Sequence, residues 1–274
     1  MYEKGIVTAL VNGQHLTVIG PNIPMVWEES IKYLWEYGRE IPTEYDKPGD
    51  PMSFDLSATL IIHDPMAEPR IHRAIPDGID GLFNYVGEVV KGTRDKDAGQ
   101  LGYTYHDRMV NYPSIEIWDE WYPGSSDVQV ATVNQLDIMI SKLKECPHTR
   151  RAQMIIWVPS IDNNTPHACC LQRVWCRIVN GALEMNIHMR SNDALKAAFM
   201  NMFAFTSLQK EIADQLGVSV GRYSHIVDSY HIYGSYFAEV EGFLKGIESR
   251  TFEERTWITA EAYYLQYGSF PMGT

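Results

Sequence analysis

Residues 170–193, CLQRVWCRIVNGALEMNIHMRSND, decide the fold. Within them, the apolar runs VWCRIV and ALEMNIHM flank Asn180-Gly181, a dipeptide that suits a two-residue turn between antiparallel strands. The run therefore predicts a β-hairpin, with Cys170 at its start and Arg190 near its end.

The neighbouring segments predict further strands and helices. AQMIIWVP (152–159) is an apolar run of strand length, and YSHIVDSYHIY (223–233) alternates as a strand does. Helical spacing of apolar residues predicts a helix over 128–146. A second predicted helix, over 194–216, is apolar nearly all round at first and ends before Gly217. We expect an α+β (mixed α/β) fold with a sheet core in the second half.

The length and composition favour one domain. With 274 residues, 45% of them hydrophobic, the chain can bury a large core. The Pro/Gly/Asp-rich residues 43–54 are typical of a loop, so we expect residues 1–274 to form a single domain. The sequence does not begin like a signal peptide, and no window approaches about 18 uncharged apolar residues. We therefore expect a soluble, cytoplasmic protein without a membrane partner.

Charge and cysteine usage narrow the function. The four cysteines (Cys146, Cys169, Cys170 and Cys176) form no zinc-type pairs, so neither a metal site nor a disulfide framework is expected. The net charge of -12 argues against binding a nucleic-acid strand. A few focused arginines could still hold a mononucleotide.

Cys170 is the candidate nucleophile. A reactive cysteine needs access to substrate and a pKa lowered by a nearby cation or a helix N-terminus. By itself, a Cys-Cys pair beside a strand is more often packed core than catalyst. The residues that follow Cys170 reverse that expectation.

Polar residues follow Cys170 at distinctive spacings: the Asn180-Gly181 turn, Arg190-Ser191-x-Asp193, Asn201, Gly221 and His231-x-Tyr233. Upstream lie Leu101-Gly102-x-x-Tyr105 and Arg150-Arg151. Over roughly residues 100–235 this pattern resembles the superfamily of thymidylate synthases and pyrimidine-nucleotide hydroxymethylases.

The resemblance implies a thymidylate synthase-like fold, in which a large mixed sheet packs on helices and also forms a dimer interface. It implies transfer of a one-carbon unit from 5,10-methylenetetrahydrofolate to C5 of a pyrimidine nucleoside monophosphate, with the sulfur of Cys170 adding to C6. Cys169 is the alternative one residue away, but the spacing to Arg190 selects Cys170.

The resemblance also assigns the anion-binding residues. Arg190 and Ser191 would bind the nucleotide phosphate, since a guanidinium presents paired donors to phosphate oxygens. Arg150 and Arg151 would reach into the site of the neighbouring subunit, which implies a homodimer.

The remaining roles concern the base, the sugar and proton transfer. Asp193 would order the base and its waters, although helix N-capping explains it equally well. Asn201 favours dUMP, with dCMP or CMP as alternatives, because a carboxamide matches the uracil edge and an aspartate suits cytosine better. His231 and Tyr233 would hold the sugar hydroxyl, unless they are core residues.

Two further residues complete the expected catalytic set. Glu88 is the candidate acid or base, and an exposed helix carboxylate is the competing interpretation. Tyr105 is the next candidate, because the matching residue lies near the thiol in family members.

Departures from ordinary thymidylate synthases favour a different final step. Leu171 replaces a His, Met189 replaces a Gln, and an N-terminal Arg-Thr-Gly loop is absent. Met189-Arg190-Ser191-Asn192-Asp193 resembles phage-type hydroxymethylases, so we expect hydroxymethylation with water as the terminal nucleophile.

Three alternatives stay open. One is a divergent, archaeal-type thymidylate synthase, which would share several of these departures and would make dTMP and dihydrofolate. Another is a non-catalytic nucleotide- or RNA-binding homologue. The last is a cysteine hydrolase with His167 or His231 as its base.

Overall fold

The computed structural model describes residues 7–117 and 128–269. Within these residues, the largest element is a mixed sheet of eight strands. Its strand order is β1-β2-β4-β11-β10-β9-β8, with β3 paired to β4. The strands are β1 (Thr8–Asn12), β2 (His15–Gly20), β3 (Arg39–Ile41), β4 (Ser53–Ile62), β8 (Gln153–Ile155), β9 (Leu171–Val179), β10 (Ala182–Asp193) and β11 (Ser219–Ile232). Parallel and antiparallel pairs both occur, which confirms the predicted mixed α/β class with a large mixed sheet.

The predicted hairpin forms as expected. β9 and β10 pair antiparallel up to Val179 and Ala182, and the turn residues Asn180 (φ 51°) and Gly181 (φ 78°) are both left-handed. Two left-handed residues match the strand twist in a two-residue turn, which explains the Asn-Gly sequence. β11 then runs parallel to β10, so that His231 lies opposite Asp193.

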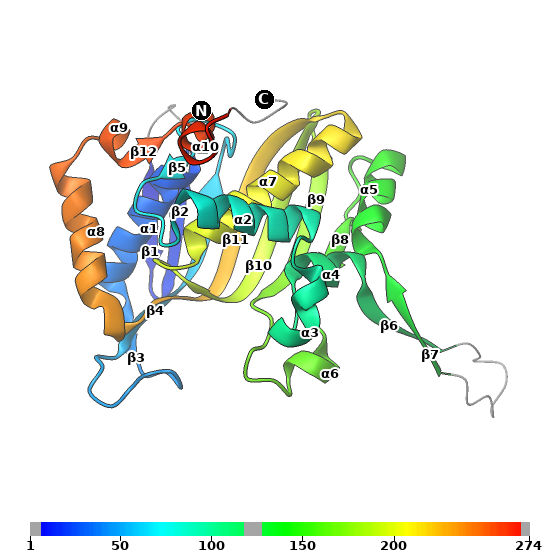
Figure 1. Ribbon diagram of the computed structural model, residues 1–274, viewed down its shortest axis with the longest axis horizontal. Coiled ribbons are helices and arrows are strands. Elements are labelled where there is room, and N and C mark those ends of the chain that lie inside the picture. Colours follow the sequence, from blue (N-terminus) through cyan, green and yellow to red (C-terminus); the bar gives the residue numbers. More distant parts are fainter. Residues whose placement is uncertain (1–6, 118–127, 270–274) are drawn as a thin grey trace.

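The remaining elements are helices and two small two-stranded ribbons. The helices are α1 (Ile23–Tyr37), α2 (Gly78–Lys91), α3 (Ala98–Leu101), α4 (Tyr105–Val110), α5 (Gln135–Glu145), α6 (Pro159–Asp162), α7 (Ala198–Leu216), α8 (Phe237–Ser249), α9 (Phe252–Arg255) and α10 (Thr259–Tyr267). Two small ribbons pair β5 (Ile71–His72) with β12 (Thr256–Trp257) and β6 (Tyr112–Ile117) with β7 (Val128–Val133). Figure 1 shows α2 and α7 crossing one face of the sheet.

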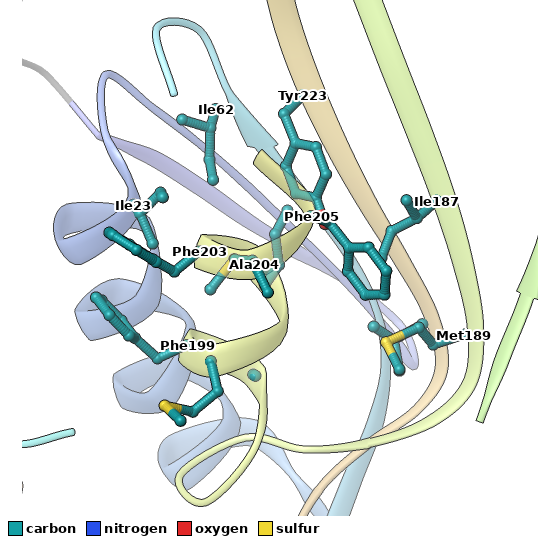
Figure 2. Packing of buried hydrophobic residues seen from close by; sticks show 14 of the residues in the cluster. Ile23, Ile62, Ile187, Met189, Phe199, Phe203, Ala204, Phe205 and Tyr223 are labelled. Carbon is teal, nitrogen blue, oxygen red and sulfur yellow. The ribbon is translucent and has the colours of Figure 1, made fainter. Parts of the chain in front are cut away.

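Helix α7 is the centre of the core. It contacts α1, α2, β10 and β11, and most of its side chains are buried, as its nearly uniform apolar sequence predicts. Figure 2 shows Phe199 and Phe203 on the side toward α1, while Ile187 and Tyr223 lie on the strands across the helix. The same helix carries Asn201, so packing of α7 in the core fixes the position of this residue relative to the sheet.

The ends of α7 differ in how well the sequence predicted them. The C-terminus is confirmed, because Gly217 adopts the left-handed conformation (φ 67°) that ends a helix. The N-terminus was predicted at 194 and lies at Ala198. The carboxylate of Asp193 accepts the backbone N–H groups of Leu195 and Lys196, which forms a turn before the helix begins.

The predicted helix over 128–146 is wrong in its first third. Residues Val128–Val133 form β7, and the helix α5 begins only at Gln135. VQVATV alternates β-branched residues and therefore favours a strand, and Asn134 ends it by accepting the N–H of Asp137 as an N-cap. The strand predicted over 152–159 is also shorter: β8 covers only Gln153–Ile155, and Pro159 is the first residue of α6.

Candidate active site

Two adjoining cavities meet at Cys170. Their volumes are about 550 and 580 Å³. Cys169 is fully buried, lines neither cavity, and donates its thiol to the carbonyl of Leu171 at 3.2 Å. Both cavities share the residues Tyr85, Glu88, Tyr105 and Cys170. The fold therefore presents Cys170, and not Cys169, to both spaces.

Arg190 on β10 holds the loop that carries Cys170. Its guanidinium donates to the carbonyls of Cys169 (3.0 Å) and Ala168 (2.7 Å), and its backbone N–H donates to the Cys170 carbonyl at 2.9 Å. Burial raises the pKa of the Cys170 thiol, and the positive charge of Arg190 opposes that rise. Arg190 also lines the second cavity, and Ser191 lines the first. The arginine predicted for phosphate thus already supports the nucleophile loop.

A buried ion pair that no sequence pattern predicted also contacts the loop that carries Cys170. Arg108 on α4 lies 3.3 Å from Asp162 on α6, and both side chains are almost completely buried. Asp162 also accepts the backbone N–H groups of Val158 (2.6 Å) and Cys169 (3.3 Å). No local pattern marks either residue, because the pair joins segments that are distant in sequence.

Asp193 ends β10 inside the first cavity. It accepts the N–H groups of Leu195 (3.0 Å) and Lys196 (2.8 Å) and the hydroxyl of Tyr236. Burial raises the pKa of its carboxyl, although these hydrogen bonds and the nearby His231 work against the rise. The helix-capping interpretation holds only for the turn before α7, since Ala197 is the N-cap of the helix.

Asn201 lines the first cavity and is already hydrogen-bonded on both sides of its carboxamide. The Tyr85 hydroxyl donates to its Oδ1 at 2.6 Å, and its Nδ2 donates to Oδ1 of Asn192 at 3.1 Å. Tyr85 precedes Glu88 by three residues on α2, so a helical projection from Glu88 could have identified it.

His231 and Tyr233 line the first cavity, with their ring centroids 4.7 Å apart. Together with Ser191 they also line a third cavity of about 290 Å³. Burial raises the pKa of Tyr233 to about 12. The two residues are therefore accessible from two cavities rather than enclosed in the core.

Glu88 on α2 and Tyr105 on α4 line both cavities together with Cys170. Glu88 is about one quarter exposed and lies 3.6 Å from the guanidinium of Arg94. Burial keeps the pKa of Tyr105 well above its ordinary value. Tyr103, another residue that the sequence did not reveal, lines the second cavity and contacts the Tyr105 ring at 5.7 Å between centroids.

Other predicted residues lie apart from these cavities. Arg150 and Arg151 are exposed between α5 and β8 and line none of the three cavities. Of the two residues that replace those of ordinary thymidylate synthases, Met189 lines the first cavity, whereas Leu171 is buried and lines none of the three.

Three structural observations concern metals, disulfides and membranes. Within residues 7–117 and 128–269, no three His, Cys, Asp or Glu side chains are grouped closely enough to hold a metal ion. The four cysteines are free thiols. None of the helices in the described part of the chain is long and apolar enough to cross a membrane.

The comparisons with known proteins agree with this arrangement. A sequence profile for thymidylate synthase matches residues 25–258. A Methanocaldococcus jannaschii protein, provisionally named a thymidylate synthase, is 28% identical over 224 residues, covering 80% of this chain and 90% of the relative. A Methanosarcina acetivorans protein with the same provisional name is 25% identical, covering 82% of this chain and 93% of the relative.

A bacterial relative matches a shorter region. The thymidylate synthase of Bacillus licheniformis is 28% identical over 142 residues, covering 46% of this chain and 50% of the relative. Since the profile spans most of the sequence, from α1 to the end of β12, the chain belongs to the thymidylate synthase family.

Proposed function

We propose that this protein transfers a one-carbon unit from 5,10-methylenetetrahydrofolate to C5 of a pyrimidine nucleoside monophosphate. The observation that carries the proposal is the position of Cys170, whose thiol is shared by two cavities of about 550 and 580 Å³. Each is of the size that holds a small-molecule ligand. A nucleotide and a reduced folate could therefore meet beside one nucleophile.

In this proposal the sulfur of Cys170 adds to C6 of the pyrimidine, which places an electron pair on C5. The folate supplies the methylene carbon that C5 attacks. The proton on C5 then leaves and the bond between the methylene carbon and the folate nitrogen breaks, so that tetrahydrofolate departs and an exocyclic methylene remains on C5. After this methylene has accepted its final nucleophile, the Cys170–C6 bond breaks and the ring regains its double bond. Glu88, Tyr105 and Asp193 line the same cavity as the thiol and are our candidates for moving these protons.

The nucleotide would be recognised by the neighbouring polar residues. Arg190 and Ser191 would bind its phosphate, and His231 and Tyr233 its sugar. Asn201 would pair with the base, which favours dUMP and leaves dCMP and CMP as alternatives. All five residues line one of the two cavities at Cys170, and Ser191, His231 and Tyr233 also line the third cavity.

We propose that the terminal step is hydroxymethylation, in which water attacks the exocyclic methylene on C5. Water needs polar partners beside the methylene, whereas hydride transfer is protected by an apolar wall. Asp77, at the start of α2, and Asn84, Tyr85 and Glu88 on the helix line the first cavity and would supply polar partners for such a water. Met189 at the same cavity adds the sequence signature of the hydroxymethylase branch.

A second candidate is methylation to dTMP, with dihydrofolate as co-product. The names of the archaeal and bacterial relatives favour it. The two routes differ in their products, because only methylation oxidises the folate to dihydrofolate.

We further propose that residues 1–274 act as one domain in a homodimer, with Arg150 and Arg151 completing the phosphate site of the partner subunit. On β9, Trp175 and Arg177 alternate with the buried Val174 and Cys176. Their side chains therefore point away from the core face of the sheet, where a second copy could cover them.

The test is incubation of the purified protein with 5,10-methylenetetrahydrofolate and each of dUMP, dCMP, UMP and CMP, followed by mass spectrometry of the nucleotide. A gain of about 30 mass units, the net addition of CH2O, is the expected result. A gain of about 14 mass units with dihydrofolate absorbance would establish methylation instead. An unchanged nucleotide in all four reactions would favour a non-catalytic binding protein.

A further inference from the structure

A buried chain of hydrogen bonds runs from the first cavity into the sheet. Tyr85 donates its hydroxyl to Oδ1 of Asn201 (2.6 Å), and Nδ2 of Asn201 donates to Oδ1 of Asn192 (3.1 Å). Nδ2 of Asn192 lies 2.7 Å from Nε2 of His225, and Nδ1 of His225 lies 2.9 Å from the hydroxyl of Tyr223. The chain thus links α2, α7, β10 and β11.

The protonation states in the chain are fixed by burial. His225 is fully buried, and burial lowers its pKa to about 3, so its ring is neutral at physiological pH. A neutral imidazole has one donor nitrogen and one acceptor nitrogen. Since Nε2 accepts from Asn192, Nδ1 must donate to Tyr223. Burial also raises the pKa of Tyr85 and Tyr223 far enough that both keep their protons.

Every donated hydrogen therefore points the same way along the chain, from Tyr85 toward Tyr223. Asn201 cannot exchange its oxygen and nitrogen alone, because its oxygen would then face the oxygen of Asn192. Tyr85 does not prevent the exchange, since its hydroxyl can also accept a hydrogen bond. An exchange at Asn201 requires Asn192 to flip and His225 to change its tautomer. The orientation of the Asn201 carboxamide is thus tied to a chain whose far end, His225 and Tyr223, lies outside the cavity.

This orientation matters for the choice of base. After its two internal hydrogen bonds, Asn201 still has one N–H and one oxygen lone pair to offer. Uracil presents an acceptor at O4 beside a donor at N3, whereas cytosine presents a donor at N4 beside an acceptor at N3. The two edges are opposite, so reversing the carboxamide exchanges the base that it matches.

We propose that Asn192 and His225 are positioning residues that set the preference for uracil or cytosine by fixing the orientation of the Asn201 carboxamide. The inference rests on the proposed function, in which Asn201 faces the base. His225 lines neither of the two cavities at Cys170 nor the third cavity. Its effect on the base therefore has to pass through Asn192, whose side chain is only 3% exposed.

The test compares kcat/KM for dUMP and dCMP in two variants of Asn192. Asn192→Leu removes both hydrogen bonds at similar size, so Asn201 becomes free to turn. We expect the ratio of the two kcat/KM values to move toward one by about tenfold, the value of one hydrogen bond. Asn192→Asp retains an acceptor for Nδ2 of Asn201 and is the matched control, so its ratio should stay close to that of the wild type.

A second variant guards against loss of folding. His225→Phe leaves Asn192 in place but removes its acceptor, and we expect a smaller shift of the ratio in the same direction. Iodoacetamide alkylation of Cys170 at an unchanged rate would show that the thiol site is intact in each variant.

The outcomes distinguish failure of the positioning role from failure of the proposed function. If Asn192→Leu and His225→Phe lower both kcat/KM values equally and leave their ratio unchanged, the residues are only structural and the inference is wrong. If the wild-type protein turns over none of the pyrimidine nucleotides, the proposed function fails and the inference fails with it. A wild type that prefers dCMP still tests the inference, because the ratio must approach one from the other side.

Discussion

Arg190 has two effects on Cys170, and they act on different properties of the thiol. Its hydrogen bonds to the carbonyls of Ala168 and Cys169 fix the position of the loop. Its charge favours the thiolate, against the burial that raises the pKa of Cys170. The sulfur therefore depends on Arg190 for both its location and its reactivity.

This balance predicts a pH dependence. The rate of iodoacetamide alkylation of Cys170 should rise with pH, because only the thiolate reacts, and its midpoint should lie above that of an exposed cysteine. In Arg190→Gln the midpoint should move further up, and below it the rate should fall by about tenfold per unit of added shift. Arg190→Lys keeps the charge and is the control.

The measurement is the pH profile of alkylation in a Cys169→Ser background, followed by peptide mass spectrometry at Cys170. Identical profiles for Arg190→Gln and the parent protein would show that Arg190 does not influence the thiol.

At the scale of elements, the Arg108–Asp162 ion pair joins α4 to α6 below the nucleophile loop. Removing one member of a buried ion pair leaves the other charge unpaired, which typically costs about 3–5 kcal/mol. We therefore expect Asp162→Ala to lower the free energy of unfolding by about that amount. Urea unfolding followed by tryptophan fluorescence measures it.

The control for this prediction is the exposed pair Lys210–Asp214 on α7, whose side chains are more than half exposed. Asp214→Ala should change the free energy of unfolding by less than about 0.5 kcal/mol. Equal effects of the two substitutions would mean that the buried pair contributes no more than a surface one.

The same elements show what the sequence could and could not predict. The Asn180-Gly181 hairpin, the body of α7 and its end at Gly217 follow from local residue preferences, and these predictions are confirmed. β7 was mistaken for helix because its apolar residues also match a helical spacing when the following helix is included. These residues form a strand because they pair with β6, and local sequence patterns do not encode that pairing.

The candidate site divides in a similar way. The residues Cys170, Arg190, Ser191, Asp193, Asn201, His231 and Tyr233 were selected by motif spacing, and the fold brings them to connected cavities. Tyr103 and His225 were missed because their roles depend on contacts between distant segments. Asn192 was identified only as part of a motif. Its hydrogen bonds to Asn201 and His225 were not predicted.

At the scale of the whole molecule, the proposed homodimer predicts complementation between two inactive variants. Cys170→Ser should lack its nucleophile, and a chain with both Arg150→Ala and Arg151→Ala should lack the phosphate contacts that it supplies to its partner. In a mixed dimer, one site would combine an intact Cys170 with intact arginines. After subunit exchange at equal amounts, about a quarter of all sites should be intact.

The measurement is the rate of product formation by each variant alone and by the mixture after exchange. Recovery of roughly a quarter of the wild-type rate supports shared sites. A mixture that stays inactive although mass spectrometry detects mixed dimers would show that the arginines serve their own subunit or no site.

The most direct test of the central claim is to trap the bond between Cys170 and the pyrimidine. Fluorine at C5 cannot leave as a proton does, so 5-fluoro-dUMP or 5-fluoro-dCMP, incubated with 5,10-methylenetetrahydrofolate, should stall after the one-carbon unit is attached. We predict that the intact protein gains the combined mass of nucleotide and folate, that peptide mapping places the adduct on Cys170, and that Cys170→Ser gains nothing. An adduct on another residue, or no adduct with either analogue, would contradict catalysis by Cys170.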